Sequence, residues 1–276
     1  MAKQTVDAID VRGRRVLVRL DLNVPLDDAG RITDDRRIVA ALPTVKRLVD
    51  GRGRVILMSH LGRPTGGAAD RRRWSLAPVA ARLGERLERP VAMLSDCVGD
   101  AVANHVFNMQ DGDVCMLENL RFHAAETIKD NKAAADSTLR REKDAFAGRL
   151  ASLADVYVND AFGTCHRDNA SMVSVPRAMA GKPRVVGYLV QRELKFLGDA
   201  VADPARPFVC VLGGAKVSDK LGVIRSLLQR CDTILIGGAM AYTFLAAAGR
   251  AIGRSLVETD LIDVAGSLRA DAGDRL

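Results

Sequence analysis

The segment that most constrains the fold of this chain is residues 15–25, which read RVLVRLDLNVP. It opens as a nearly continuous apolar run, a pattern typical of a strand buried on both faces of a parallel sheet. Asp21 and Asn23 stand at its carboxyl end, and Pro25 stops it. Ligands of open α/β sheets bind in the crevice beyond the carboxyl ends of the strands. The segment therefore predicts a parallel sheet with a polar site at this edge.

Three later apolar runs, residues 55–59, 114–117 and 156–158, are also followed by polar side chains. The arginine fork suits phosphate and carboxylate, so several arginines beyond neighbouring strand ends indicate a pocket for an anion. The residues that follow the three runs are His60, Gly62 and Arg63, then Glu118, Asn119 and Arg121, and finally Asn159, Asp160, His166 and Arg167.

Two of the candidate residues have plain structural alternatives. Arg37 lies near the start of a helix expected after Asp34 and faces either the pocket or solvent. A single histidine such as His60 is more often structural than catalytic, but the neighbouring Arg63 favours a binding role.

The order of elements predicts an α/β protein with a doubly wound parallel sheet, because strands alternate with helices at regular spacing. Residues 176–183 form a turn region, residues 188–197 have helical periodicity, and residues 202–207 mark a clear break. A second β-α-β series follows this break. We therefore expect a first domain at 1–184, a connecting helix or hinge at 185–204, and a second domain at 205–276.

The second series contains two glycine-rich strand ends. Residues 213–220 (GGAKVSDK) follow one strand, and Gly237 and Gly238 follow the next. Backbone amides, a helix N-terminus and two lysines one turn apart suit a phosphate group. The segment is not a Walker A loop, since the order G-x-x-x-x-G-K-[ST] is absent.

The formal net charge is +7, and residues 1–184 carry most of it, with 30 Lys and Arg against 24 Asp and Glu. A basic half suits either a small phosphorylated molecule or a nucleic acid. The sequence has no RNA-binding fingerprint and no zinc-finger spacing, so we expect no nucleic-acid partner. Residues 71–73 and the polar segment 126–143 are expected to be exposed surface, the latter helical and without chemistry.

The five cysteines are widely spaced and form no C-x-x-C pair, which favours reduced, mostly buried thiols over disulfides or zinc. With four scattered histidines, we expect no metal site. No apolar run approaches the roughly 20 residues of a membrane span, and the N-terminus lacks the apolar centre of a signal peptide. We therefore expect a cytoplasmic protein without a membrane partner.

Taken together, these motifs resemble the phosphoglycerate kinase family from about Val11 to the C-terminus. The resemblance implies two Rossmann-like doubly wound parallel-sheet domains that close by a hinge motion, in a chain we expect to be a monomer. It also implies glycolytic phosphoryl transfer between ATP and 3-phosphoglycerate, giving ADP and 1,3-bisphosphoglycerate, with Mg²⁺ carried by the nucleotide. Seven motifs in family order carry it: residues 15–25, 32–43, 59–64, 117–122, 157–167, 213–220 and 237–244.

The same resemblance assigns roles to individual residues. Arg37 and Lys216 are the implied catalytic residues, because both are placed to meet the transferred phosphoryl group. No general base or covalent intermediate is required. The implied nucleotide contacts are Gly214, Lys216, Lys220 and Gly238. The implied 3-phosphoglycerate contacts are Asp21, Asn23, Arg37, His60, Leu61, Gly62, Arg63, Arg121 and Arg167.

The chain departs from the family pattern at three positions and at its end. Asp168 and Asn169 replace an Ala-His pair, and Asp168 is expected to weaken anion binding at Arg167. Ala239 replaces a glycine beside the adenine pocket. Family members continue past the position of Leu276, so we expect the second domain to be truncated. The alternative function is then a catalytically incomplete fragment that only binds phosphoglycerate, and a third, resting on charge alone, is nucleic-acid binding.

Overall fold

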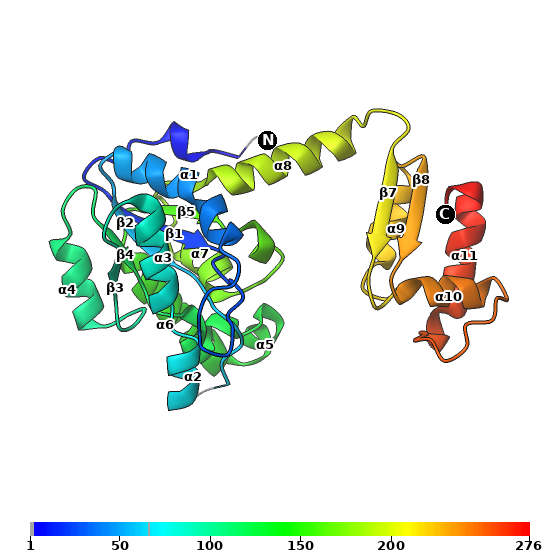
Figure 1. Cartoon of the computed structure of the whole chain (residues 1–276), viewed down its shortest axis with the longest axis horizontal. Coiled ribbons are helices and arrows are strands. Elements are labelled where there is room, and N and C mark those ends of the chain that lie inside the picture. Colours follow the sequence, from blue (N-terminus) through cyan, green and yellow to red (C-terminus); the bar gives the residue numbers. More distant parts are fainter. Residues whose placement is uncertain (1–2, 66) are drawn as a thin grey trace. The chain divides into compact units, whose positions relative to one another are not determined.

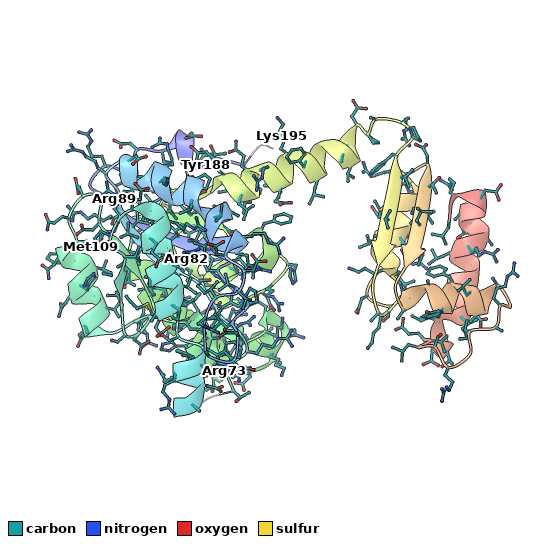
Figure 2. All side chains as sticks on the ribbon, in the orientation of Figure 1. Arg73, Arg82, Arg89, Met109, Tyr188 and Lys195 are labelled. Carbon is teal, nitrogen blue, oxygen red and sulfur yellow. The ribbon has the colours of Figure 1, made fainter. Side chains whose placement is uncertain are left out.

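The computed structural model describes residues 3–65 and 67–276, which form two compact units that divide between Lys195 and Phe196 (Figure 1). The division falls inside helix α8 (Tyr188–Ala202), which begins at the residue predicted for this helix. Figure 2 shows Tyr188 at its start and Lys195 further along it.

The first unit is built on a six-stranded sheet with the order β3-β4-β2-β1-β5-β6. All of its strand pairings are parallel, and β1 pairs with β2 on one side and β5 on the other. The strands are β1 (Arg15–Leu20), β2 (Arg54–Met58), β3 (Ala92–Met93), β4 (Val114–Met116), β5 (Val156–Asp160) and β6 (Arg184–Val186).

Both faces of this sheet are covered by helices (Figure 1), which confirms the predicted doubly wound α/β class. Val16 and Val18 of β1 pack in a core with residues of α1 and α3. Leu17, which points to the other face, packs with residues of α4 and α6. The helices of the first unit before α8 are α1 (Arg36–Asp50), α2 (Ala68–Arg73), α3 (Ala77–Leu87), α4 (Asp100–Asn108), α5 (Asp130–Ala135), α6 (Ser137–Ser152) and α7 (Val175–Ala178).

The polar segment from Glu126 to Lys143 is helical as predicted, but the prediction that it is all exposed surface is wrong. The side chains of Glu126 and Lys143 are fully buried. Lys143 Nζ lies 2.7 Å from Asp130 Oδ1 and 2.8 Å from the Ile128 carbonyl oxygen, and it also donates to the Asp168 carbonyl. An ammonium group has three donors, so this set satisfies it and permits its burial.

The second unit confirms the predicted β-α-β series, with two parallel strands and a separate apolar core that includes Ile224, Ile234 and Phe244. Val211 and Leu235 remain 74% and 52% exposed on this two-stranded sheet. Its elements are β7 (Val209–Gly213), α9 (Leu221–Leu228), β8 (Thr233–Gly237), α10 (Met240–Ala247) and α11 (Ile262–Ala272).

The cysteines are all free thiols, and three of them, Cys97, Cys115 and Cys231, are buried. Burial raises the pKa of the Cys115 thiol to about 12. Cys165 is exposed. Among the described residues, no helix combines the length and the apolar character needed to cross a membrane.

Helix α8 is fastened to the first unit by two buried acceptors. Asp160 Oδ1, at the end of β5, accepts a hydrogen bond from the Val190 amide (3.1 Å). Thr44 Oγ1, on α1, accepts from the Tyr188 amide (2.9 Å). These amides belong to the first turn of α8 and have no acceptor within the helix, so the two side chains cap it.

We expect Asp160→Ala to lower the free energy of unfolding by about 1–2 kcal/mol, because it removes the cap and leaves a buried amide unpaired. The matched control is Asp28→Ala, an exposed position, where a change within about 0.5 kcal/mol is expected. Denaturant titration measures both. Equal losses for the two variants would contradict the capping role.

Candidate functional site

The strand register brings the predicted site residues of the first unit to one edge. Arg19 of β1 pairs with Met58 of β2 and with Asn159 of β5, so the segments after these strands begin side by side. Two hydrogen bonds join the segments after β1 and β2: the Leu22 amide donates to Ser59 Oγ (2.9 Å), and the Gly62 amide donates to Asn23 Oδ1 (2.8 Å).

Asp21 and Arg37 form an ion pair at this edge, with 2.5 Å between Asp21 Oδ2 and Arg37 Nη1. The Arg37 side chain is 50% exposed. It therefore contacts solvent while one of its nitrogens is paired with Asp21 at the site. Both residues line a cavity of about 360 Å³, together with Phe162 and Gly163. A Cβ at Gly163 would lie 2.5 Å from Asp21 Oδ2, so only glycine leaves this carboxylate in place.

His60 is buried, 4% exposed, directly after β2. Its Nδ1 atom lies 3.2 Å from Arg19 Nη2. Burial is the largest cause that lowers the pKa of His60 to about 2, and the positive charges of Arg19, Arg121, Arg167 and Arg37 contribute to the same shift. The imidazole is therefore neutral, and the guanidinium groups of several different elements act on it from nearby.

Arg121 and Arg167 each hold a buried Nε atom that has no hydrogen-bond partner within the described residues. Arg121 Nη1 donates to the Gly62 carbonyl (2.5 Å), which fixes the side chain while Nε stays unpaired. Burial lowers the pKa of Arg121, and Arg167 and Arg19 add to that effect. Unpaired buried donors are costly, and an anion with several oxygens is the partner that satisfies two adjacent guanidinium groups.

The loop after β2 supplies one free charged group, Arg63, but no free group at Leu61. Arg63 is exposed and makes no hydrogen bond or ion pair within residues 3–65 and 67–276. The Leu61 side chain lies in the core, and its amide and carbonyl are bonded to Asn119, so it presents no free group. At Gly62, with φ +59°, a Cβ would lie 2.2 Å from the Trp74 ring. This glycine is required by packing.

In the second unit, Gly213 pairs with Gly237, so the two glycine-rich segments begin at the same sheet edge. Gly238 has φ +71°, and a Cβ there would lie 2.8 Å from the Gly214 carbonyl oxygen. Lys220 directly precedes α9, and Lys216 is exposed. The four predicted nucleotide residues therefore lie together on this unit.

Two amides ahead of α9 are occupied by a carboxylate that the sequence analysis missed. Val217 and Ser218 donate their backbone N–H groups to Glu258 Oε2 at 2.5 and 3.1 Å, and Ser218 Oγ donates to Oε1 at 2.6 Å. The hydroxyl of Ser218 is the main cause that lowers the pKa of Glu258. This bracing fixes the loop between β7 and α9.

Arg19 was not predicted as a site residue. It lies in the apolar run of β1 and is only 1% exposed, although its side chain is charged. A charged residue within an apolar strand was the sequence feature that could have indicated it. Asp168, which the sequence predicts to weaken anion binding at Arg167, has partners of its own: its Oδ1 lies 3.1 Å from Lys129 Nζ, and its Oδ2 accepts from the Asp130 amide (2.8 Å). The position therefore has its own local cation.

One group of metal-ligand side chains comes together within residues 3–65 and 67–276: Asp96, Cys97 and His123. Asp96 Oδ1 accepts from the Cys97 amide (2.6 Å) and lies 2.5 Å from His123 Nε2. Cys97 Sγ donates to the Glu118 carbonyl (2.9 Å). The three side chains thus satisfy one another and their neighbours without an ion.

These features define a class: a doubly wound α/β protein with arginines beyond the carboxyl ends of its strands, an arrangement that suits an anion. A phosphoglycerate kinase family model matches residues 6–275. The chain belongs to the phosphoglycerate kinase family, as the sequence motifs indicated.

Curated relatives and a solved structure agree with this membership. Phosphoglycerate kinase of Rhodopirellula baltica is 55% identical over all 276 residues, and that of Anaeromyxobacter sp. strain K is 50% identical over 274 residues. The chain spans 66% and 65% of their lengths. The phosphoglycerate kinase structure from Coxiella burnetii has a TM-score of 0.77 and 34% identity, covering 98% of this chain and 63% of that one.

We expect the burial of neutral His60 to make stability depend on pH. Its pKa is about 2 in the folded chain against 6.5 for the ordinary group, so the unfolded chain binds this proton more readily. The contribution is fully present above pH 6.5 and is lost as the pH falls. Between pH 6 and pH 4, wild type should lose about 2 kcal/mol more unfolding free energy than His60→Gln does.

The control for this prediction is His105→Gln, on the exposed part of α4, which should follow the wild-type profile. Denaturant titrations at each pH give the profiles. If wild type and His60→Gln lose stability in parallel, His60 is not a buried neutral group.

Proposed function

We propose that this chain performs the phosphoglycerate kinase reaction, the reversible transfer of a phosphoryl group between ATP and 3-phosphoglycerate, giving ADP and 1,3-bisphosphoglycerate in glycolysis. The observation that carries the proposal is the pair of buried, unpartnered Nε atoms on Arg121 and Arg167 beside a neutral His60. Membership of the family supports it.

In this proposal the first unit holds 3-phosphoglycerate. The fork of an arginine side chain binds two oxygens at once, so the arginines would hold the phosphate and carboxylate of the substrate. Asp21 and Asn23 would accept from its hydroxyl group. The cavity of about 360 Å³ beside Asp21 and Arg37 has room for part of such a small acid. The proposed arginines are Arg37, Arg63, Arg121 and Arg167.

The second unit would hold the nucleotide, with Mg²⁺ arriving as part of it. Gly214 and Gly238 allow a ligand to approach the backbone because neither carries a Cβ. Lys216 and Lys220 would supply positive charge to the phosphates. Hinge closure that keeps water from the reacting group belongs to this proposal, as do a monomeric state and a cytoplasmic location, which the free cysteines support.

The chemistry explains why cations dominate the proposed site. A phosphoryl group in transfer carries charge on its equatorial oxygens, and catalysis consists mainly of positioning and electrostatic stabilisation. Arg37 from the first unit and Lys216 from the second would stabilise that charge. No side chain has to form a covalent intermediate.

We expect Arg167→Met to weaken 3-phosphoglycerate binding by about 30-fold in calorimetric titration, because a charged hydrogen-bond donor contributes about 1.5–3 kcal/mol. The matched control is Arg14→Met, which removes the same charge from the exposed amino end of β1 and should leave the affinity unchanged. Glycerate, which lacks the phosphate, should bind far more weakly than 3-phosphoglycerate.

Other outcomes of this titration separate the alternatives. An equal loss for Arg14→Met and Arg167→Met would mean that net charge, not the site, governs binding. Steep loss of binding with salt, and no preference for a small phosphorylated acid, would favour nucleic-acid binding.

We expect the wild-type chain to bind Mg-ADP, and Lys220→Met to weaken that binding by about tenfold through the lost ammonium–phosphate contact. Arg254→Met removes an exposed charge from the same unit and serves as the control. Titration with a fluorescent ADP analogue measures the affinities. Binding of 3-phosphoglycerate without any nucleotide binding would contradict the kinase proposal and support the phosphoglycerate-binding alternative.

A further inference from the structure

The most unusual buried group of the first unit is the Arg19 guanidinium. It lies in β1 at 1% exposure, and it makes no ion pair within the described part of the chain. Its donors go instead to neutral acceptors: Nε to Ser171 Oγ (2.9 Å), Nη1 to the Leu20 carbonyl, and Nη2 to His60 Nδ1 (3.2 Å). A guanidinium buried only for packing would be expected to meet a carboxylate directly.

The negative charge nearest to Arg19 along its hydrogen bonds is the Glu126 carboxylate, which is linked to it through the Ser171 hydroxyl group. Arg19 Nε can only donate, so Ser171 Oγ accepts there and turns its own hydrogen to Glu126 Oε1 at 2.7 Å. Glu126 is fully buried and also accepts from the Ser171 amide (2.9 Å) and from Asn169 Nδ2 (3.2 Å). The direction of every hydrogen bond from Arg19 to Glu126 is therefore fixed.

Ser171 itself has little freedom to rotate away from this path. Its side chain has no exposed surface, and it lies in the short segment Ala170–Ser174. The Tyr157 hydroxyl, on β5, donates to its carbonyl oxygen (2.8 Å). Three elements, β5, Ala124–Thr127 and Ala170–Ser174, thus hold the Arg19 side chain in one position.

The same logic continues at His60. Arginine has no acceptor, so the contact between Arg19 Nη2 and His60 Nδ1 is a hydrogen bond only if Nδ1 carries no proton. The proton of the neutral ring must then sit on Nε2. This nitrogen makes no hydrogen bond within residues 3–65 and 67–276, so its N–H remains available to a ligand.

We propose that Arg19, held by Ser171 and Glu126, is a positioning residue that fixes the tautomer of His60, so that a neutral Nε2–H donates to the substrate anion. The inference rests on the proposed function for the identity of that anion, 3-phosphoglycerate, but not for the tautomer. His60 thereby adds a directed hydrogen bond among the guanidinium groups without adding charge.

The charges near His60 agree with this assignment. Four arginines act on the ring electrostatically: Arg19 from β1, Arg37 from α1, Arg121 after β4 and Arg167 after β5. Each disfavours the doubly protonated ring. The charges alone would leave either neutral tautomer available, and only the hydrogen bond from Arg19 selects one of them.

The test is a nitrogen NMR spectrum of the histidine rings in the ligand-free 276-residue chain. We expect His60 Nδ1 to give a pyridine-type resonance and Nε2 a pyrrole-type resonance, unchanged from pH 5 to pH 8. The His60→Gln spectrum identifies the signals, and exposed His105 is the internal reference for a solvated ring. A proton on Nδ1, or a doubly protonated ring at pH 7, overturns the proposal.

Three variants separate positioning from structural support. In Arg19→Met the ring should populate both tautomers, whereas Arg15→Met, on the same strand but paired with Asp155, should retain the wild-type signals. If Arg19→Met does not fold, Ser171→Ala takes its place. This variant keeps Arg19 but removes one of its acceptors, and it should broaden or partly shift the His60 signals. Wild-type signals in a folded Arg19→Met chain also overturn the proposal.

Binding completes the test. Arg19→Met should weaken 3-phosphoglycerate binding about tenfold, while Arg19→Lys, which retains a donor, should recover part of the loss. If wild type binds no 3-phosphoglycerate but shows the Nε2–H tautomer, the proposed function fails and the role of Arg19 stands. If 3-phosphoglycerate binds but the Nε2–H tautomer is absent, the role of Arg19 fails and the proposed function stands.

Discussion

The parallel register of β1 with β2 and β5 is the constraint on which the rest of the first unit depends. It places Arg19 level with Met58 and Asn159, so the chain leaves three strands at one edge. Backbone hydrogen bonds and the two covering cores fix this register, since a shift of one residue would exchange the faces of every side chain. The segments that form the candidate site are therefore brought together by the pairing of the strands themselves.

Much of this arrangement was predictable from local pattern. The apolar run of residues 15–20 gave the central strand, and polar residues at strand ends gave the site edge, since both signals lie within a few neighbouring residues. Strand β6 was not predicted, because three residues after a proline carry too little periodicity. The roles of Arg19 and Glu126 were missed for a different reason: their partners lie far away in sequence, and no local pattern encodes such contacts.

The same limit explains the error over the segment from Glu126 to Lys143. Charged residues at helical spacing normally indicate a solvated face, and most of this segment has one. Its two ends are buried because Glu126 meets Ser171 and Lys143 meets the Asp168 carbonyl. Both partners come from the loop after β5, so the two buried charges tie that loop to the helical segment. The positive site and its supporting carboxylate are thus parts of one network.

The pairing of β1 with β5 also has a consequence for synthesis of the chain. Asp155 meets Arg15 across 140 positions of sequence. At a translation rate of about 5–20 residues per second, β1 exists for on the order of 10 s before β5 has been made. During that interval the side of β1 that will pair with β5 has no partner strand. The six-stranded sheet can therefore be completed only late in synthesis, after its central strand has been followed by a neighbour far along the chain.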